Sequence, residues 1–501
     1  MDTRVSGRRK LAHGCVCVLL LMLGACSATK PHKYPVDSAG DDIECGVVAA
    51  IADDRCHART PEVSQRPAYT LHFVEFDDQG WLYPDVPEMR KAHEQLGRAI
   101  DDVRRRLDAG ERVLLLVFVH GWKHSAAFDD RDVTRFRQML ADAAELDSLQ
   151  ARVDTDPDAG GRAVERSIVG IYVGWRGAGS LSPDNPLVNL SFWSRKNAAL
   201  HVSAGASREL FARIRSLRER FNTDDGVDPR LRTVVIGHSF GGWIAFSALS
   251  PSILELLSSP VDTGLAPEAE QARTAWRRER LRHTADIVIL VNPAFEATRY
   301  QPVHYLAQTL PKHLELARHE PPLLLLITST ADRATRIAFP AGRFVNTLFQ
   351  RPFVSDEQEA AAERTPGFIE GYRTHRLTRL PAQPGACAGW QDSPQEMADG
   401  EGYVPTPENE ADRRARLRAN AQLEHEHTRR WRAYLTEHGG VPPYGWDWQF
   451  CGGASIRHEQ GNPRAPVWNV VTDASLIRSH SDLMREPLHA FLRQLYLELP
   501  R

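Results

Sequence analysis

The feature that most constrains the fold is the stretch 231–249, LRTVVIGHSFGGWIAFSAL. Its apolar, β-branched run at 233–236 has the composition of a buried central strand. The run leads into a G-x-S-x-G step centred on Ser239, and an apolar helical pattern follows. In such a strand–turn–helix the serine is held in a strained backbone conformation, and the flanking glycines let strand and helix cross closely. We therefore predict that Ser239 is a nucleophile exposed at the carboxyl edge of a sheet.

Other apolar runs alternate with helical patterns along the chain. Runs typical of strands lie at 69–76, 112–119, 167–173, 285–291, 322–328 and 466–472, and helical patterns at 87–107, 192–221 and 487–497. Most of these runs are nearly continuous, as in parallel strands buried on both faces; the run at 69–76 alternates, which favours an antiparallel strand with one solvated face. We predict an α/β fold with a doubly wound, mostly parallel sheet and flanking helices.

The run at 112–119 ends in a second motif, His120-Gly121-Trp122. A tetrahedral acyl intermediate needs two N–H donors directed at one oxygen. The backbone amides of Trp122 and of Phe240, the residue after Ser239, are the natural pair for such an oxyanion hole. We interpret His120 as a histidine that fixes this loop by hydrogen bonds and not as a catalytic base.

Five segments carry a family resemblance: FVHGW, YVGWRG, GHSFGG, LVNPAFEA and SHSD, in this order along the chain. Together they resemble the α/β-hydrolase superfamily and, more narrowly, bacterial α/β-hydrolase-like lipoproteins of largely unassigned activity. The similarity covers about residues 67–340 and 466–501. It implies the α/β-hydrolase fold with a long insertion before the last strand. It also implies hydrolysis of an ester, thioester or amide through an acyl-enzyme, without a cofactor.

The chain order of that superfamily places the acid and then the base after the nucleophile. Asp332 lies past the second strand after Ser239, where the family acid is usually found, and it also fits a helix N-cap. Glu296, past the first of those strands, is the alternative acid. His480 follows the last strand and is the predicted base, because an imidazole can take the Ser239 proton and return it to the leaving group.

The first 25 residues are typical of a signal peptide, with a basic start and an apolar core at 16–23 that is short for a membrane span. The core ends in Leu-Gly-Ala-Cys, which resembles a bacterial lipobox with Cys26 as the lipidated first residue of the mature chain. An uncleaved membrane helix is the alternative, which the short core disfavours. Ser27 is not the aspartate that favours inner-membrane retention, so we expect anchorage to the outer membrane, facing the periplasm.

The remaining cysteines form an even set in an oxidising compartment: Cys45, Cys56, Cys387 and Cys451. We expect the pairs Cys45–Cys56 and Cys387–Cys451, although four cysteines allow three connectivities. A metal site is the rival interpretation, which the absence of a C-x-x-C pair disfavours. His425 and His427 also point to different sides of their helix.

The expected domain organisation is a signal peptide (1–25), a lipidated tether (26–66), a hydrolase core (67–340), an insertion that is a candidate cap (341–465), and a closing strand and helix (466–501). The charged helix at 408–435 is interpreted as a solvated face. A net charge of −3, without a basic stripe, argues against nucleic-acid binding.

The sequence thus predicts an envelope-anchored serine hydrolase, carboxylesterase-like or lipase-like, acting on small or lipidic carboxylic esters with no cofactor and no metal. Its partners would be the ester substrate and the membrane. The alternative is a binding or scaffolding lipoprotein that retains the hydrolase fold without catalysis. Because Ser239, Asp332 and His480 are all present, the enzyme is favoured.

Overall fold

The fold was analysed in a computed structural model of the 501-residue chain. The structure describes residues 31–35, 59–65, 67–83, 94–153, 165–178, 191–222, 229–258, 269–310, 321–347, 353–382, 385–398, 402–406, 408–437, 447–483 and 485–497. The expected signal peptide, Cys26 and the expected Cys45–Cys56 pair lie outside these residues.

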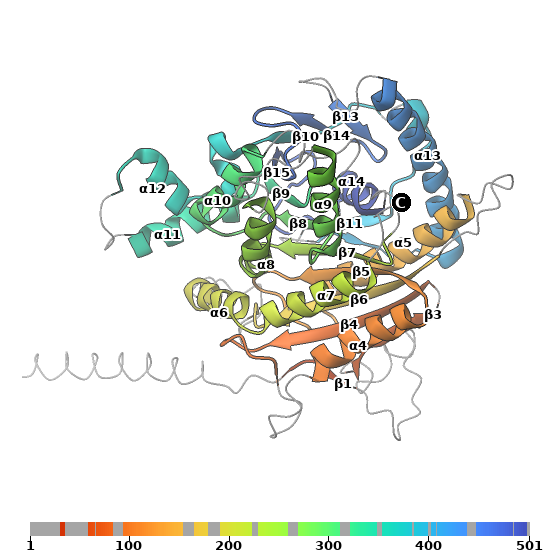
Figure 1. The fold of residues 1–501 in the computed structure, drawn as a ribbon, viewed down its shortest axis with the longest axis horizontal. Coiled ribbons are helices and arrows are strands. Elements are labelled where there is room, and N and C mark those ends of the chain that lie inside the picture. Colours follow the sequence, from red (N-terminus) through yellow and green to blue (C-terminus); the bar gives the residue numbers. More distant parts are fainter. Residues whose placement is uncertain are drawn as a thin grey trace, which may run out of the picture.

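An eleven-stranded mixed sheet runs through the molecule (Figure 1). From one edge to the other its strands are β13 (Asp447–Phe450), β14 (Ala454–His458), β10 (His375–Arg379), β15 (Val467–Thr472), β9 (Leu324–Ser329), β8 (Ile287–Val291), β7 (Leu231–His238), β5 (Arg112–Val119), β6 (Arg166–Trp175), β4 (Ala68–Phe76) and β3 (Glu62–Gln65). From β10 to β4 every neighbouring pair is parallel, whereas β3, β14 and β13 pair antiparallel. Separate short ladders join β1 (Tyr34–Pro35) to β2 (Arg59–Thr60) and β11 (Gln395–Ala398) to β12 (Gly402–Pro405).

Helices cover both faces of the sheet, as predicted. One face carries α4 (Glu94–Asp108), α6 (Phe192–Ala204), α7 (Ser207–Phe221), α8 (Phe240–Ser258), α9 (Ala269–Arg282), α10 (Ala297–Gln308), α11 (Phe339–Thr347) and α12 (Asp356–Glu363). The other carries α5 (Arg131–Val153), α13 (Glu410–Glu437) and α14 (Glu486–Leu497). Each strand therefore needs apolar side chains on both sides, which explains the continuous apolar runs. In β5, Leu115 and Val117 enter the first core and Leu116 and Phe118 the second.

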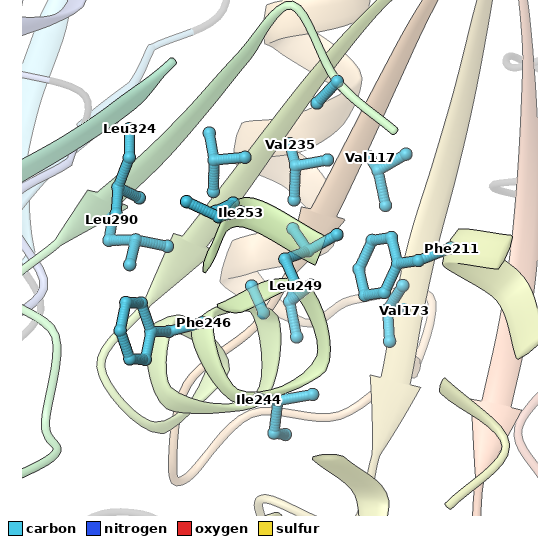
Figure 2. Packing of buried hydrophobic residues seen from close by; sticks show 14 of the residues in the cluster. Val117, Val173, Phe211, Val235, Ile244, Phe246, Leu249, Ile253, Leu290 and Leu324 are labelled. Carbon is cyan, nitrogen blue, oxygen red and sulfur yellow. The ribbon is translucent and has the colours of Figure 1, made fainter. Parts of the chain in front are cut away.

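Helix α8 lies at the centre of the first core. Figure 2 shows its apolar side chains Ile244, Phe246, Leu249 and Ile253 beside residues of the sheet strands. By length and apolarity α8 is the one helix in the described part of the chain that could cross a membrane, but 61% of its apolar window is buried. That burial is typical of a core helix.

Two local expectations were wrong. The strand at 69–76 pairs antiparallel with β3, as expected, but it also pairs parallel with β6, and α4 and α5 pack against it, so it has no solvated face. The helical pattern at 192–221 forms two helices, α6 and α7, which separate at Gly205. A Cβ at Gly205 would lie 2.5 Å from the carbonyl oxygen of Gly80, so the chain turns there to admit a neighbouring loop.

Much of the insertion at 341–465 is built into the sheet. Strands β10, β13 and β14 extend it beyond β15, and α13 packs on α5. The side chain of Asn469 in β15 donates to the carbonyl oxygens of Pro366 and Tyr372, both at 3.0 Å. These bonds fasten the insertion to the last core strand.

The expected pair Cys387–Cys451 is present as a disulfide between buried cysteines. It links the segment after β10 to the turn between β13 and β14. The side chain of Gln494 in α14 accepts from the Cys451 amide at 3.0 Å and donates to its carbonyl oxygen at 2.7 Å.

Removing this bridge should destabilise the protein. The half-cystines are 64 residues apart, and closing a loop of that size lowers the entropy of the unfolded chain by an amount worth about 4 kcal/mol. We expect Cys387→Ala/Cys451→Ala to unfold at a lower urea concentration than the wild type. A reductant should lower the midpoint of the wild type by more than that of the variant, which keeps the expected Cys45–Cys56 pair; an equal drop in both would refute a stabilising role for this bridge.

Candidate active site

The turn at Ser239 joins β7 to α8 as the sequence predicts, but Ser239 is buried, at 3% exposed, and not exposed as expected. Ser239 has φ +55°, a conformation that non-glycine residues rarely adopt. A Cβ at Gly237 would lie 2.8 Å from the Gly242 Cα, and one at Gly241 would lie 2.1 Å from the Val119 carbonyl oxygen. Both glycines are therefore required for strand, turn and helix to cross so closely.

The structure brings Ser239, His480 and Asp332 into one hydrogen-bonded relay. The Ser239 Oγ lies 2.7 Å from His480 Nε2, and His480 Nδ1 lies 2.8 Å from Asp332 Oδ2. The side chain of Asp332 is fully buried, whereas that of His480 is 24% exposed. The imidazole can thus exchange a proton with the hydroxyl on one side while the carboxylate holds its other nitrogen.

Asp332 is fixed by its own loop as well as by His480. Its Oδ1 accepts from the Ala334 amide at 2.8 Å, and its Oδ2 accepts from the hydroxyl of Thr335. The cap and the acid interpretations therefore hold together. Burial raises the pKa of Asp332, but the nearby His480 charge and these hydrogen bonds outweigh it, so its pKa lies below the ordinary value. The carboxylate form is favoured.

Two side chains that the sequence analysis did not single out hold the backbone of His480. The Asn292 amide Nδ2 and the His238 ring Nε2 both lie 2.9 Å from the His480 carbonyl oxygen. Burial lowers the pKa of His238 to about 3, so the ring is neutral and Nε2 carries the donating hydrogen. Asn292, at φ +45°, also accepts from the Ser329 amide at 3.0 Å. The available signal was a polar residue at the end of each of two core strands: His238 is the last residue of β7, and Asn292 directly follows β8.

The loop with Trp122 packs directly against the turn at Ser239. A Cβ at Gly121 would lie 3.0 Å from the Ser239 Cβ, so the two backbones are in contact. Phe240 begins α8, and the first amides of a helix have no partner within it. Trp122 and Phe240, whose amides are predicted for the oxyanion hole, thus both lie beside the turn at Ser239, with their ring centroids 6.3 Å apart.

His120 fixes this loop, as predicted. Its Nε2 accepts from the Trp175 amide at 3.0 Å, and its Nδ1 lies 2.9 Å from the Gly121 carbonyl oxygen. The Trp175 indole donates back to the His120 carbonyl oxygen at 2.8 Å. Burial lowers the pKa of His120 to about 4, which favours the neutral ring.

Glu296, the alternative acid, takes part in a different cluster. Its carboxylate lies 2.9 Å from Lys196 Nζ, 2.8 Å from Arg299 Nε and 3.1 Å from Arg343 Nη1. Burial raises its pKa, but these three cations outweigh that effect and hold the pKa at about 2. Since His480 pairs with Asp332 instead, Glu296 is a structural ion-pair partner.

Among the described residues, one group has the spacing of a metal site: Cys387, His427 and Cys451. The two cysteines form the disulfide, so they offer no thiolate, and His427 Nε2 lies 2.7 Å from the Gln449 carbonyl oxygen. The group is therefore better explained as a bridge with a neighbouring histidine.

A hollow of about 700 Å³ lies at the other edge of the sheet, beside Ala68 of β4 and Arg166 of β6. These residues begin their strands, whereas Ser239, Asp332 and His480 all follow the carboxyl ends of strands. The hollow is thus remote from the relay and plays no part in its chemistry.

The ion pairs of Glu296 predict a pH-dependent contribution to stability. Because its folded pKa of about 2 is below the ordinary 4.5, the carboxylate should stabilise the fold by about 3 kcal/mol above pH 4.5 and lose this as the pH falls toward 2. In urea unfolding, the free energy of unfolding of Glu296→Gln should lie well below that of the wild type at pH 7, and this difference should shrink at low pH. The exposed Glu255→Gln serves as the control and should show little deficit at either pH.

Comparison with known proteins yielded no match: no family model, curated protein or solved structure matches this chain. The assignment of roles at this site therefore depends on the geometry described above.

Proposed function

We propose that this protein is a serine hydrolase of the α/β-hydrolase fold, which cleaves carboxylic esters through an acyl-enzyme and is held in the bacterial envelope by a lipid on Cys26. The relay from Ser239 through His480 to Asp332, at hydrogen-bond distances of 2.7 and 2.8 Å, is the observation that carries the proposal. The mostly parallel sheet, with all three residues beyond strand carboxyl ends, supports the fold assignment. A binding or scaffolding protein would not need the relay.

In the proposed acylation step, the Ser239 Oγ attacks the ester carbonyl carbon while His480 Nε2 takes the hydroxyl proton. Negative charge develops on the former carbonyl oxygen, where the amides of Trp122 and Phe240 would donate hydrogen bonds. The tetrahedral intermediate then collapses, the bond to the alcohol breaks, and the imidazolium protonates the departing alkoxide. Asp332 keeps the ring oriented and stabilises its positive charge throughout.

Deacylation repeats these roles with water as the nucleophile. His480 takes a proton from the water as its oxygen attacks the acyl carbon, and it returns a proton to Ser239 as the carboxylic acid leaves. The strained φ of Ser239 keeps the hydroxyl at the apex of the turn in both steps. The same groups therefore serve both half-reactions without a metal or cofactor taking part.

The direct test is labelling with a fluorophosphonate probe alongside turnover of a p-nitrophenyl ester series. Ser239→Ala should abolish labelling and turnover, His480→Ala should lower turnover by about 10⁶-fold, and Asp332→Asn should lower it by about 10⁴-fold. Glu296→Gln, assayed where it remains folded, should retain turnover, because its carboxylate does not contact His480. A wild-type protein that neither labels nor turns over any ester would favour the binding or scaffolding alternative.

Loss of the Asn292 amide should lower kcat more than it changes KM. Asn292→Gly removes one of two donors to the His480 carbonyl oxygen and leaves the backbone at φ +45° relaxed, so the loop can shift the imidazole by a fraction of an ångström. We expect kcat to fall by about 10-fold in initial-rate measurements. Asn292→Ala should lower kcat further than Asn292→Gly does, because a residue with a Cβ is strained at positive φ. Unchanged kcat in Asn292→Gly would show that His238 alone holds the carbonyl.

A further inference from the structure

The segment that leads back to the predicted lipid anchor is docked firmly on the protein. The amides of His32 and Lys33 both donate to the Glu75 carboxylate at 2.8 Å, and Gln95 Nε2 donates to the Lys33 carbonyl oxygen at 2.8 Å. The Lys33 side chain is fully buried, with Nζ 2.9 Å from Glu62 and 4.3 Å from the Phe73 ring centroid. A buried, paired lysine implies a defined position for this segment.

The direction of the docked segment follows from its contacts. Pro35 pairs with Thr60, whose hydroxyl accepts from the Phe73 amide at 3.0 Å. His32, three residues earlier, lies at Glu75, which is further along β4. Followed backwards from residue 35 to 31, the chain thus runs along β4 toward its carboxyl end.

Glu75 lies level with the turn that carries Ser239. Glu75 pairs with Gly174 in β6. Gly174 lies one residue beyond the row of the sheet in which Val119 of β5 pairs with Gly237 of β7. The strands β4, β6, β5 and β7 are adjacent, so three strand spacings, about 14 Å, separate this point from the nucleophile. The docked segment and Ser239 therefore lie at the same edge of the sheet.

The chain between the anchor and this point is short. Residue 31 is five positions after Cys26, and a fully extended chain of five residue steps spans about 18 Å at most. A lipid on Cys26 would therefore hold the carboxyl edge of β4 within about 20 Å of the bilayer surface. The edge that bears the relay would face the membrane or lie close beside it.

Helix α6 extends along this edge and exposes an uncharged face. Near its start, the Ser191 hydroxyl accepts from the Trp122 indole at 3.3 Å, and near its end the Gly80 carbonyl oxygen accepts from the Ala206 amide at 3.0 Å. Its exposed side chains are Trp193, Ser194, Asn197, Leu200, His201 and Ala204, of which none is Asp, Glu, Lys or Arg. Arg195 and Lys196, in contrast, are buried in ion pairs.

Two tryptophans stand out on this surface. Trp193 and Leu200 are 40% and 37% exposed, and their spacing of seven residues places them on one side of α6. Trp81, 63% exposed, belongs to the turn that follows β4. Gly80 of the same turn packs against α6. Tryptophans with an apolar body and a polar N–H are favoured at the membrane–water interface. We call the exposed side chains of α6 together with Trp81 the α6 face.

We propose that the α6 face rests on the lipid bilayer, so that the site at Ser239 acts on long-chain acyl esters embedded in that membrane. This inference rests on the proposed function and on lipidation of Cys26. The short tether brings the edge to the bilayer, and the uncharged face lets it settle there without desolvating paired charges. The anchor and the α6 face thereby select a lipid substrate over a soluble one.

Orientation is tested by quenching of tryptophan fluorescence, which needs no turnover. Full-length protein, extracted with its lipid from membranes, is reconstituted in phosphatidylcholine vesicles with or without brominated acyl chains. Bromine should quench the wild type, and Trp81→Phe/Trp193→Phe should lose at least half of that quenching. Trp276→Phe, which alters a buried tryptophan, should not. Equal quenching in the wild type and the double variant would overturn the proposed orientation, as would no quenching in the wild type.

Substrate class is tested with a fluorogenic long-chain ester embedded in the same vesicles, beside soluble p-nitrophenyl acetate. Trp81→Asp/Leu200→Asp should lower turnover of the embedded ester at least 10-fold and leave that of the soluble ester unchanged. Val63→Asp/Tyr305→Asp alters exposed apolar residues elsewhere and should leave both rates unchanged. Equal turnover of the embedded ester by both double variants would refute the proposal.

The two tests separate the inference from the proposed function. Quenching that depends on Trp81 and Trp193, without turnover of any ester, would support the orientation and reject the hydrolase. Turnover of the soluble ester without such quenching would support the hydrolase and reject the membrane-facing edge. Binding of the α6 face to another protein would also leave the brominated lipid without effect.

Discussion

Parallel strands of one sheet all end at the same edge, and the candidate site depends on this constraint. Ser239 follows β7, Asp332 follows β9 and His480 follows β15, three strands that lie close together in the sheet. Residues 241 positions apart thus come within 2.7 Å of each other without any local relation in sequence. The register of buried strands fixes the heights of these loops, so the apolar core determines the geometry of the polar relay.

Burial gives the histidines around the relay different properties. His120 and His238 are buried, and burial lowers their pKa values to about 4 and about 3. They remain neutral and act as fixed hydrogen-bonding groups for the loops at Trp122 and His480. The side chain of His480 is partly exposed and sits between a hydroxyl and a carboxylate. One residue type therefore provides both the neutral histidines that hold the loops and the candidate proton-transfer group of the site.

Much of this arrangement could be predicted from the sequence because each prediction rested on a local pattern. Continuous apolar runs indicated the parallel strands, and the glycines around Ser239 indicated a crossing that admits no side chain. The prediction that His480 pairs with Asp332 and not with Glu296 had less support in the sequence, because both acids follow strands and only their three-dimensional neighbours distinguish them. The donors Asn292 and His238 were missed, since their partner is a backbone carbonyl far away in sequence. The parallel pairing of β4 was also missed, because its alternating pattern does not report that helices cover both faces.

The position of β15 has a consequence for the order in which the molecule assembles. This strand begins at residue 467, yet it lies between β9 and β10, and β10 pairs parallel with β15 and antiparallel with β14. The sheet therefore has a gap until residues 467–472 have left the ribosome. During that interval β9 presents an open edge, and the strands β10, β13 and β14 have no core strand to join. His480 follows β15, so a chain that ends before this strand would contain Ser239 and Asp332 but not the histidine that joins them.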